Sequence, residues 1–237
     1  MLSPDGRVIM ISAANRGIGY EFAKNLYEQG YTLSLGARDE AKLAEVTRGF
    51  DADRVLTHLF EAQDISTSEA WVEATVARFG RIDGLLNVVG VSTPFSITDE
   101  DEADLDMMFE INVKAPLRLI RLTLPYLKKS GNGRIINVCS ASGKRVSTDW
   151  VGYHMTKFAT VALSHAARRV AWDEGVRAVA FCPGVTNTDM SVGRNKGPTD
   201  QMTQPEDLAE LAATLLALPN NASVAEIIIN RRLEDML

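Results

Sequence analysis

The chain has 237 residues, of which 46% are hydrophobic, 24% charged and 7% aromatic, and this composition excludes disordered, collagen-like and disulfide-scaffold proteins. Its 25 basic and 31 acidic residues give a net charge of −6, which disfavours a nucleic-acid-binding protein because phosphate contacts need a basic surface. Two cysteines, Cys139 and Cys182, are too few for a disulfide framework or a four-thiolate metal site, and we expect no metal. With no signal-peptide pattern and no apolar run of roughly 18 residues, we expect a cytoplasmic protein with no membrane partner.

Short apolar segments alternate with longer segments of helical period along the whole chain. Seven segments rich in Val, Ile and Leu are predicted as strands: 7–12, 32–37, 55–61, 82–89, 134–140, 177–182 and 225–230. Most are apolar on both faces, as expected for parallel strands that helices cover on each side. The alternation predicts one domain over residues 1–237, a doubly wound α/β fold with a seven-stranded, mostly parallel sheet and helices on both faces.

Local signals place several helix ends. Gly30 ends the first predicted helix, and the capping-box pattern that begins at Ser66 starts another. A long helical stretch, 101–129, contains Pro116 and Pro125, which predict a helix start and a bend.

The segment 186–204 has no clear period and follows the sixth predicted strand. Right-handed crossovers place the carboxyl ends of all the strands at one rim, where open α/β sheets bind ligands. We therefore expect this segment to cover a substrate site at the rim, and the alternative is a plain surface loop.

Glycines occur where the first strand meets the first helix, in the segment 12–19. Such a turn lets a pyrophosphate approach the backbone and the helix N-terminus, whose free N–H groups favour anions. Arg38 follows the second strand, where an acidic residue would bind a free ribose 2′-hydroxyl, and Arg16 extends from the glycine turn toward the same region. Two guanidiniums suit a 2′-phosphate, so the sequence favours NADP(H), with NAD(H) as the alternative.

Tyr153 and Lys157 are four residues apart, which places them on one face of a predicted helix. Ser140 closes the fifth predicted strand at the same rim, and Asn112 lies in the long helical stretch. These residues occur in one order with further motifs: Gly17-Ile18-Gly19, Asp64, Asn87, Asn112, Ser140, Tyr153/Lys157, and Pro183-Gly184 with Thr188. This order over nearly the whole chain resembles the single-domain short-chain dehydrogenase/reductase family.

The resemblance implies a Rossmann-type fold and roles for four catalytic residues. Tyr153 would be the general acid or base, and Lys157 would supply the cation that a tyrosine base needs. Ser140 would hold the substrate oxygen, and Asn112 would open its helix and anchor a water.

The resemblance also implies binding residues. Asp64 and Ile65 would contact the adenine, and Val185 and Thr188 the nicotinamide carboxamide. The expected cofactor-binding residues are Ala13, Asn15, Arg16, Gly17, Ile18, Gly19, Arg38, Asp64, Ile65, Asn87, Gly90, Tyr153, Lys157, Pro183, Gly184, Val185 and Thr188. The expected substrate-contacting residues are Ser140, Ser142, Val146, Trp150 and Tyr153.

Three positions depart from the family pattern. Ala13 replaces the first glycine of the loop, so we expect either a negative φ there or a displaced loop. Val88 and Val89 replace an asparagine and a small residue, and Val89 would crowd the cofactor ribose.

His154 directly follows Tyr153, so its side chain points a quarter-turn away on the helix and is not expected to be catalytic.

The complete catalytic set predicts an NADP(H)-dependent oxidoreductase that transfers a hydride between the nicotinamide and a small-molecule carbonyl or secondary alcohol. The alternative is a non-catalytic NADP(H)-sensing or interaction protein on the same scaffold. An epimerase or dehydratase would need a larger C-terminal substrate domain. The resemblance further implies a homodimer or homotetramer, and we expect Cys139 and Cys182 to be buried structural thiols.

Overall fold

The computed structural model describes residues 1–191 and 197–233, and it contains a seven-stranded sheet of order β3-β2-β1-β4-β5-β6-β7. Each pair of neighbouring strands is parallel. The strands are β1 (Val8–Ser12), β2 (Thr32–Ala37), β3 (Val55–Leu59), β4 (Gly84–Asn87), β5 (Arg134–Val138), β6 (Arg177–Pro183) and β7 (Glu226–Ile229). The predicted doubly wound fold is therefore confirmed, and all seven predicted strands are present.

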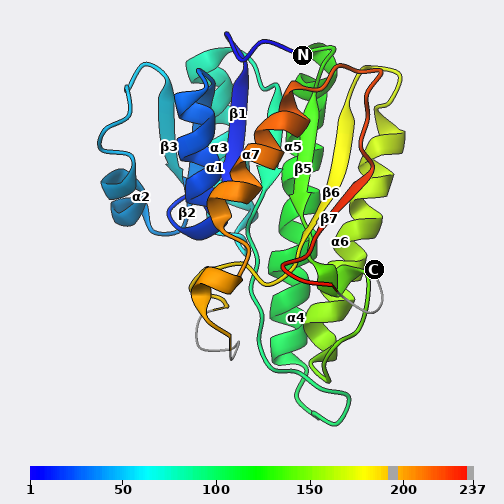
Figure 1. Cartoon of the computed structure of the whole chain (residues 1–237). Helices are drawn as coiled ribbons and strands as arrows, with labels where there is room; N and C mark the ends of the chain where they lie inside the picture. Colours follow the sequence, from blue (N-terminus) through cyan, green and yellow to red (C-terminus); the bar gives the residue numbers. More distant parts are fainter. Residues whose placement is uncertain (192–196, 234–237) are drawn as a thin grey trace.

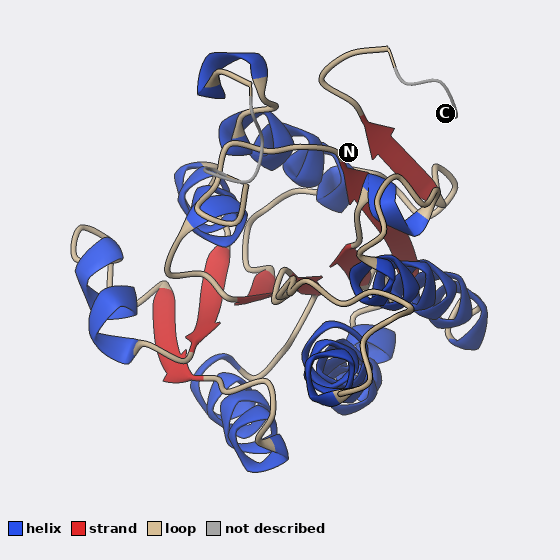
Figure 2. Cartoon of the chain, turned by 90° about the horizontal axis from the view of Figure 1, so that it is seen from below, coloured by secondary structure: helices blue, strands red, loops and turns tan. Residues whose placement is uncertain are grey.

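Helices cover both faces of the sheet (Figures 1 and 2). The α-helices are α1 (Gly17–Glu28), α2 (Glu40–Val46), α3 (Ile65–Phe79), α4 (Ala103–Phe109), α5 (Ala115–Lys129), α6 (Val151–Val170) and α7 (Pro205–Ala217). Helices α1 and α7 pack side by side across the front of the sheet in Figure 1. Residues of α3, α5 and α6 contribute to a second core on the opposite face. Within the described ranges, no helix combines the length and hydropathy that crossing a bilayer requires.

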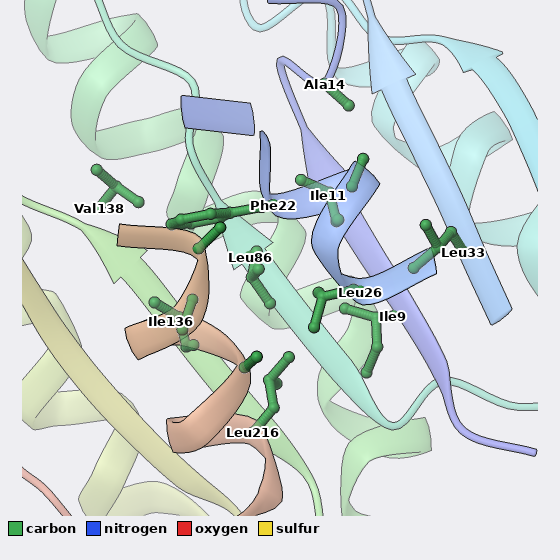
Figure 3. Packing of buried hydrophobic residues seen from close by; sticks show 14 of the residues in the cluster. Ile9, Ile11, Ala14, Phe22, Leu26, Leu33, Leu86, Ile136, Val138 and Leu216 are labelled. Atoms are coloured by element: carbon green, nitrogen blue, oxygen red, sulfur yellow. The ribbon is translucent and has the colours of Figure 1, made fainter. Parts of the chain in front are cut away.

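The larger core lies between the sheet and helices α1 and α7 (Figure 3). Phe22 of α1 and Leu216 of α7 pack over Ile11, Leu86 and Ile136 of the three central strands, and all five side chains are buried. Full burial of one such side chain stabilises the fold by roughly 1.5–3 kcal/mol. This core therefore fixes the strands whose carboxyl ends carry the site.

Strands β3, β4, β5 and β7 end one or two residues earlier than predicted, and hydrogen bonds give the reason for β4. Strand β4 stops at Asn87 because the next two backbone N–H groups, of Val88 and Val89, donate to the Ser12 hydroxyl at 2.9 and 3.2 Å. The chain therefore leaves the sheet beside the end of β1. Because β1 and β4 are neighbours whose crossovers run in opposite directions, this is the point where an open α/β sheet binds its ligand.

Helix ends follow the predictions with one correction. Gly30 has a φ of +100° just after α1, as a left-handed helix stop requires. Helix α3 begins at Ile65 rather than at a Ser66 capping box, because the carboxylate of Asp64 accepts the Ser66 N–H at 2.9 Å and caps the helix. The stretch 101–129 is α4 and α5 joined by a π-helical turn, with Pro116 in the first turn of α5.

Candidate active site

Helix α6 brings Tyr153 and Lys157 to one face, as their spacing predicts. Lys157 is 4% exposed, and its Nζ donates to the carbonyl of Val138 at 3.0 Å. The same Nζ lies 5.6 Å from the centroid of the Tyr153 ring. The end of β5 thus holds a buried ammonium beside a half-buried phenol, where it can stabilise negative charge on the phenol oxygen.

Two glycines allow neighbouring segments to pack closely on α6. A Cβ on Gly143 would lie 2.6 Å from the Lys157 carbonyl oxygen, and one on Gly152 would lie 2.6 Å from the Met108 methyl. The 3₁₀ turn Ala141–Gly143 therefore packs directly on the helix backbone. Its N-cap is Ser140, whose Oγ accepts the Ser142 N–H at 3.1 Å. Ser140 and Lys157 consequently share one small region of the rim.

Asn112 lies in the π-helical turn Glu110–Lys114, so the expected opening of the helix at this residue is present. Asn112 is 1% exposed, and its side chain forms hydrogen bonds with both peptide groups of Val91. Its Oδ1 accepts from the Val91 N–H at 2.8 Å, and its Nδ2 donates to the Val91 carbonyl at 2.9 Å. It also donates to the Thr156 hydroxyl at 3.0 Å. A Cβ on Gly90 would lie 3.4 Å from Asn112 Oδ1 and 3.5 Å from Lys157 Nζ, so these groups adjoin.

A cavity of about 320 Å³ lies at the switch point between β1 and β4. Its lining residues come from the glycine turn, the ends of β2, β3 and β4, and the helices beside them: Ala13, Asn15, Arg16, Ala37, Arg38, Asp39, Lys42, Phe60, Glu61, Ala62, Val89, Gly90, Val91 and Ile111. Five of these were predicted as cofactor contacts. Val89 lines the cavity as expected from its position.

Of the two expectations for Ala13, the negative φ is wrong, and the displaced loop stays a prediction. Its φ is +55°, and no other non-glycine residue of the described chain has a positive φ. In this turn the carbonyl oxygen of Ala13 lies so close to Gly19 that a Cβ there would collide with it, and the N–H of Ala14 donates to the Gly36 carbonyl. The left-handed alanine costs roughly 1–2 kcal/mol, which the packing of the turn on α1 offsets.

Three cationic side chains line the outer end of the cavity: Arg16, Arg38 and Lys42. Arg16 pairs with Asp189 at 3.0 Å on the surface, and Lys42 pairs with Glu45 at 3.0 Å. Sequence reasoning missed Lys42, which lies in the first turn of α2, just after Arg38 and the N-cap Asp39.

The two residues predicted to contact the adenine do not line this cavity, and their contact with the adenine stays a prediction. Glu61 and Ala62 line the cavity, whereas Asp64 and Ile65 do not. Hydrogen bonds from the hydroxyl and N–H of Ser66 lower the pKa of Asp64, whose carboxylate is thus used in capping α3. Ile65 is 46% exposed on the first turn of that helix. Asp64 follows β3 at the rim, but its carboxylate caps α3 and does not line the cavity.

Other predicted contacts lie around the cavity without lining it. Asn87 donates to Asn137 across β4 and β5 at 2.8 Å. The chain beyond β6 runs past the glycine turn, since a Cβ on Gly17 would lie 3.4 Å from the Thr188 methyl. The remaining predicted cofactor residues outside the cavity wall are Gly17, Ile18, Gly19, Tyr153, Lys157, Pro183, Gly184, Val185 and Thr188. Of the predicted cover 186–204, residues 192–196 lie outside the described chain.

The expected substrate residues lie on the segment between β5 and α6. Ser142 is in the 3₁₀ turn, Trp150 directly precedes α6, and Val146 between them is 59% exposed. This segment borders the Ser140 hydroxyl and the half-buried Tyr153.

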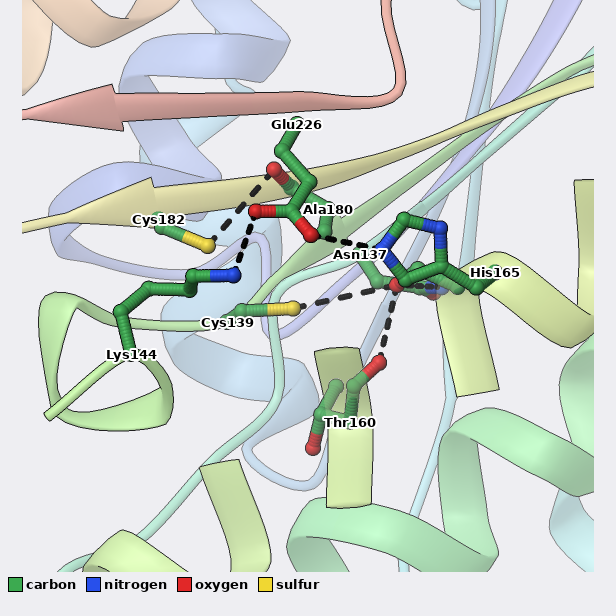
Figure 4. A network of polar contacts seen from close by, with 9 residues as sticks. Asn137, Cys139, Lys144, Thr160, His165, Ala180, Cys182 and Glu226 are labelled. Carbon is green, nitrogen blue, oxygen red and sulfur yellow. Dashed lines mark hydrogen bonds and ion pairs between the residues drawn. The ribbon is translucent and has the colours of Figure 1, made fainter. Parts of the chain in front are cut away.

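Cys139 and Cys182 are free, buried thiols next to the site (Figure 4). A hydrogen bond with Cys182, together with burial, raises the pKa of Cys139 well above its usual value. Beside them, Glu226 of β7 accepts hydrogen bonds from Lys144 at 2.7 Å and His165 at 2.6 Å, which lower the pKa of this carboxyl. The described part of the chain contains no group of three or more acidic, His or Cys residues suited to a metal ion.

One family model and several known proteins match this chain over most of its length. A family model described as short chain dehydrogenase matches residues 7–199. The chain is 43% identical over 218 residues to an agropine synthesis reductase of Rhizobium rhizogenes, covering 92% of this chain and 50% of that protein. It therefore spans about half the length of that relative. An uncharacterised oxidoreductase of Staphylococcus saprophyticus is 29% identical over 232 residues, covering 97% of this chain and 99% of that one.

A solved structure with a similar fold is the alcohol dehydrogenase of the archaeon Thermococcus sibiricus complexed with 5-hydroxy-NADP. It superposes with a TM-score of 0.84 at 26% identity, covering 94% of this chain and 95% of that one.

Proposed function

This chain belongs to the short-chain dehydrogenase family, and we propose that it is an NADP(H)-dependent oxidoreductase acting on a carbonyl or secondary alcohol. The observation that carries the proposal is the buried Lys157 ammonium beside Tyr153, with the Ser140 hydroxyl on the adjoining turn. An acid, a cation that stabilises its conjugate base, and a hydroxyl donor are what a proton transfer to a ketone oxygen needs.

Tyr153 delivers a proton from its Oη to the substrate oxygen during reduction and takes it back during oxidation. The Lys157 ammonium stabilises the negative charge left on Oη, and its bond to the Val138 carbonyl holds it in place. Ser140 donates its hydroxyl proton to the same substrate oxygen, because its Oγ already accepts the Ser142 N–H. When bound, the nicotinamide supplies or receives the hydride.

The cavity fits a dinucleotide carrying a 2′-phosphate. Gly17 adopts a φ of +52° in the turn at the start of α1, whose free N–H groups suit a pyrophosphate. Arg16, Arg38 and Lys42 surround the outer end of the cavity, where the adenosine ribose lies in dinucleotide folds. Three cations at that place favour NADP(H) over NAD(H).

The relatives support this proposal in part. The agropine synthesis reductase is named for a reduction, and the archaeal alcohol dehydrogenase was solved with an NADP derivative. We propose reduction of a ketone as the principal direction, with the segment 186–204 covering the substrate. Met155 and Phe158 are partly exposed on α6, and a homodimer or homotetramer would cover them.

The activity is tested by screening carbonyls and alcohols while following nicotinamide absorbance, with NADPH/NADP⁺ and NADH/NAD⁺ in parallel. We expect turnover with NADPH and at least one ketone. Tyr153→Phe should retain NADPH binding and lose nearly all turnover. Cofactor binding without turnover on any substrate in the wild type would favour the sensing protein instead.

Cofactor preference is tested separately with Arg38→Gln and Lys42→Gln. Each removes a charge-assisted contact worth roughly 1.5–3 kcal/mol, so NADPH affinity should fall about tenfold or more while NADH affinity stays the same. Lys24→Gln, an exposed charge on α1 that does not line the cavity, is the matched control. An equal loss for both cofactors would contradict a 2′-phosphate site.

A further inference from the structure

His154 is a buried residue of the site region for which the reaction gives no role. It follows Tyr153 on α6 and is 3% exposed. Both ring nitrogens have partners: Nδ1 lies 3.0 Å from the carbonyl oxygen of Ser142, and Nε2 lies 3.3 Å from the hydroxyl of Thr148. Buried polar groups are normally hydrogen-bonded, so the pairing alone shows no role, and the informative observation is which segments the two partners belong to.

The partners determine the tautomer of the neutral ring. A carbonyl oxygen can only accept, so Nδ1 carries the proton and donates to Ser142. A neutral imidazole has a single N–H, so Nε2 is the acceptor and the Thr148 hydroxyl donates to it. The Thr148 oxygen in turn accepts the Trp150 N–H at 3.3 Å.

These bonds form one continuous chain with the catalytic serine. From the outside inward, donation runs from the Trp150 N–H to Thr148, from Thr148 to His154, and from His154 to the Ser142 carbonyl. The N–H of the same Ser142 donates to the Ser140 Oγ at 3.1 Å. His154 therefore ties the segment expected to contact substrate to the turn that carries Ser140.

We propose that His154 is a positioning residue that orients the Ser140 hydroxyl through Ser142 and anchors the 148–150 segment through Thr148. The inference rests on the proposed reductase activity and extends it. With Ser142 held by the ring, its N–H stays on the Ser140 oxygen, and the Ser140 hydrogen remains directed at the substrate. The two contacts of the ring have separate consequences: the Ser142 contact affects the chemical step, and the Thr148 contact affects substrate binding.

Two substitutions separate these contacts. In His154→Asn the amide nitrogen can occupy the place of Nδ1 and still donate to Ser142, while the Thr148 contact is lost. In His154→Gln the longer amide can reach Thr148, while the Ser142 contact is lost. We expect kcat to fall about tenfold in His154→Gln, as loss of one positioning hydrogen bond implies, and KM to rise with nearly unchanged kcat in His154→Asn.

Thr148→Val provides a variant that should fold, since Thr148 is exposed, and it should reproduce the raised KM of His154→Asn. Leu163→Ala, further along α6, is the control for destabilisation alone and should lower the melting temperature without changing kcat or KM. If the Asn and Gln variants show the same kcat and KM, or if Leu163→Ala shows the kcat loss of His154→Gln, the proposal is overturned.

A measurement without turnover distinguishes failure of this inference from failure of the proposed activity. Long-range proton–nitrogen spectra of ¹⁵N-histidine protein, assigned by the loss of signals in His154→Gln, report which ring nitrogen is protonated. A protonated Nδ1 with a bare Nε2 is expected even if no substrate is found, and the opposite tautomer refutes the chain of bonds.

Discussion

Asn112 offers the sharpest test of how the rim is held together. Its amide satisfies both peptide groups of Val91, and Val91 belongs to the chain that leaves β4 next to the cavity. Asn112→Leu keeps a side chain of similar length but can neither accept nor donate. The substitution therefore leaves the Val91 N–H and carbonyl without a partner at a site where Asn112 itself is 1% exposed.

The expected cost follows from these two groups. Each unsatisfied buried group costs roughly 1–3 kcal/mol. Val91 is half-buried, so water can compensate in part, and we expect about 3 kcal/mol in total. For a chain of this size each kcal/mol corresponds to about 2–4 °C, which predicts a fall in melting temperature of roughly 6–12 °C.

Differential scanning calorimetry of the wild type and Asn112→Leu measures this fall. Thr156→Val is the comparison variant, since it removes the Asn112–Thr156 contact and the bond from the Thr156 hydroxyl to the Tyr153 carbonyl but leaves both Asn112–Val91 hydrogen bonds intact. It should cost about 1 kcal/mol. A melting temperature for Asn112→Leu within about 2 °C of the wild type would show that the two Asn112–Val91 hydrogen bonds do not stabilise the rim, and the reasoning would be refuted.

Three further predictions concern the surroundings of the site. Gly143→Ala would force the turn away from the α6 backbone, so calorimetry should show roughly 1–3 kcal/mol of destabilisation. An activity assay should show a lowered kcat, and an unchanged kcat would contradict the packing argument. Glu226→Gln should cost about 1 kcal/mol near pH 7 in urea denaturation. Because hydrogen bonds from Lys144 and His165 lower the pKa of Glu226, the difference in stability between wild type and variant should narrow as the pH falls below the usual pKa of a glutamate, and a constant difference would argue against the pairing. Cys139, buried and with a raised pKa, should resist a thiol reagent in the folded protein and react after unfolding, so stoichiometric labelling of the native protein would show that the site opens.

Features that depend on local spacing were predictable from the sequence. The seven strands follow from apolar runs bounded by turns, and the Tyr153–Lys157 pair follows from helical period. The positions of Arg16 and Arg38 beside the cavity follow from strand ends, because parallel strands bring their carboxyl ends to one rim. Such inferences need only the chain order and the geometry of regular elements.

Features that depend on contacts between elements were not predictable in the same way. Ala13 has a positive φ in a turn whose carbonyl packs closely on Gly19 of the following helix, an approach that composition alone does not show. Asp64 and Ile65 lie off the cavity because the precise start of α3 decides which residues after β3 face inward.

By itself, then, the sequence determined the doubly wound sheet, its rim and the spacing of Tyr153 and Lys157 along α6. Only the tertiary structure decided that Lys42 faces the cavity and that His154 contacts Ser142 and Thr148. The physical reason is that regular hydrogen-bonded elements have fixed periods, so they can be inferred residue by residue. Side-chain partners are instead set by how close two separate segments approach, and that distance exists only once the chain has packed.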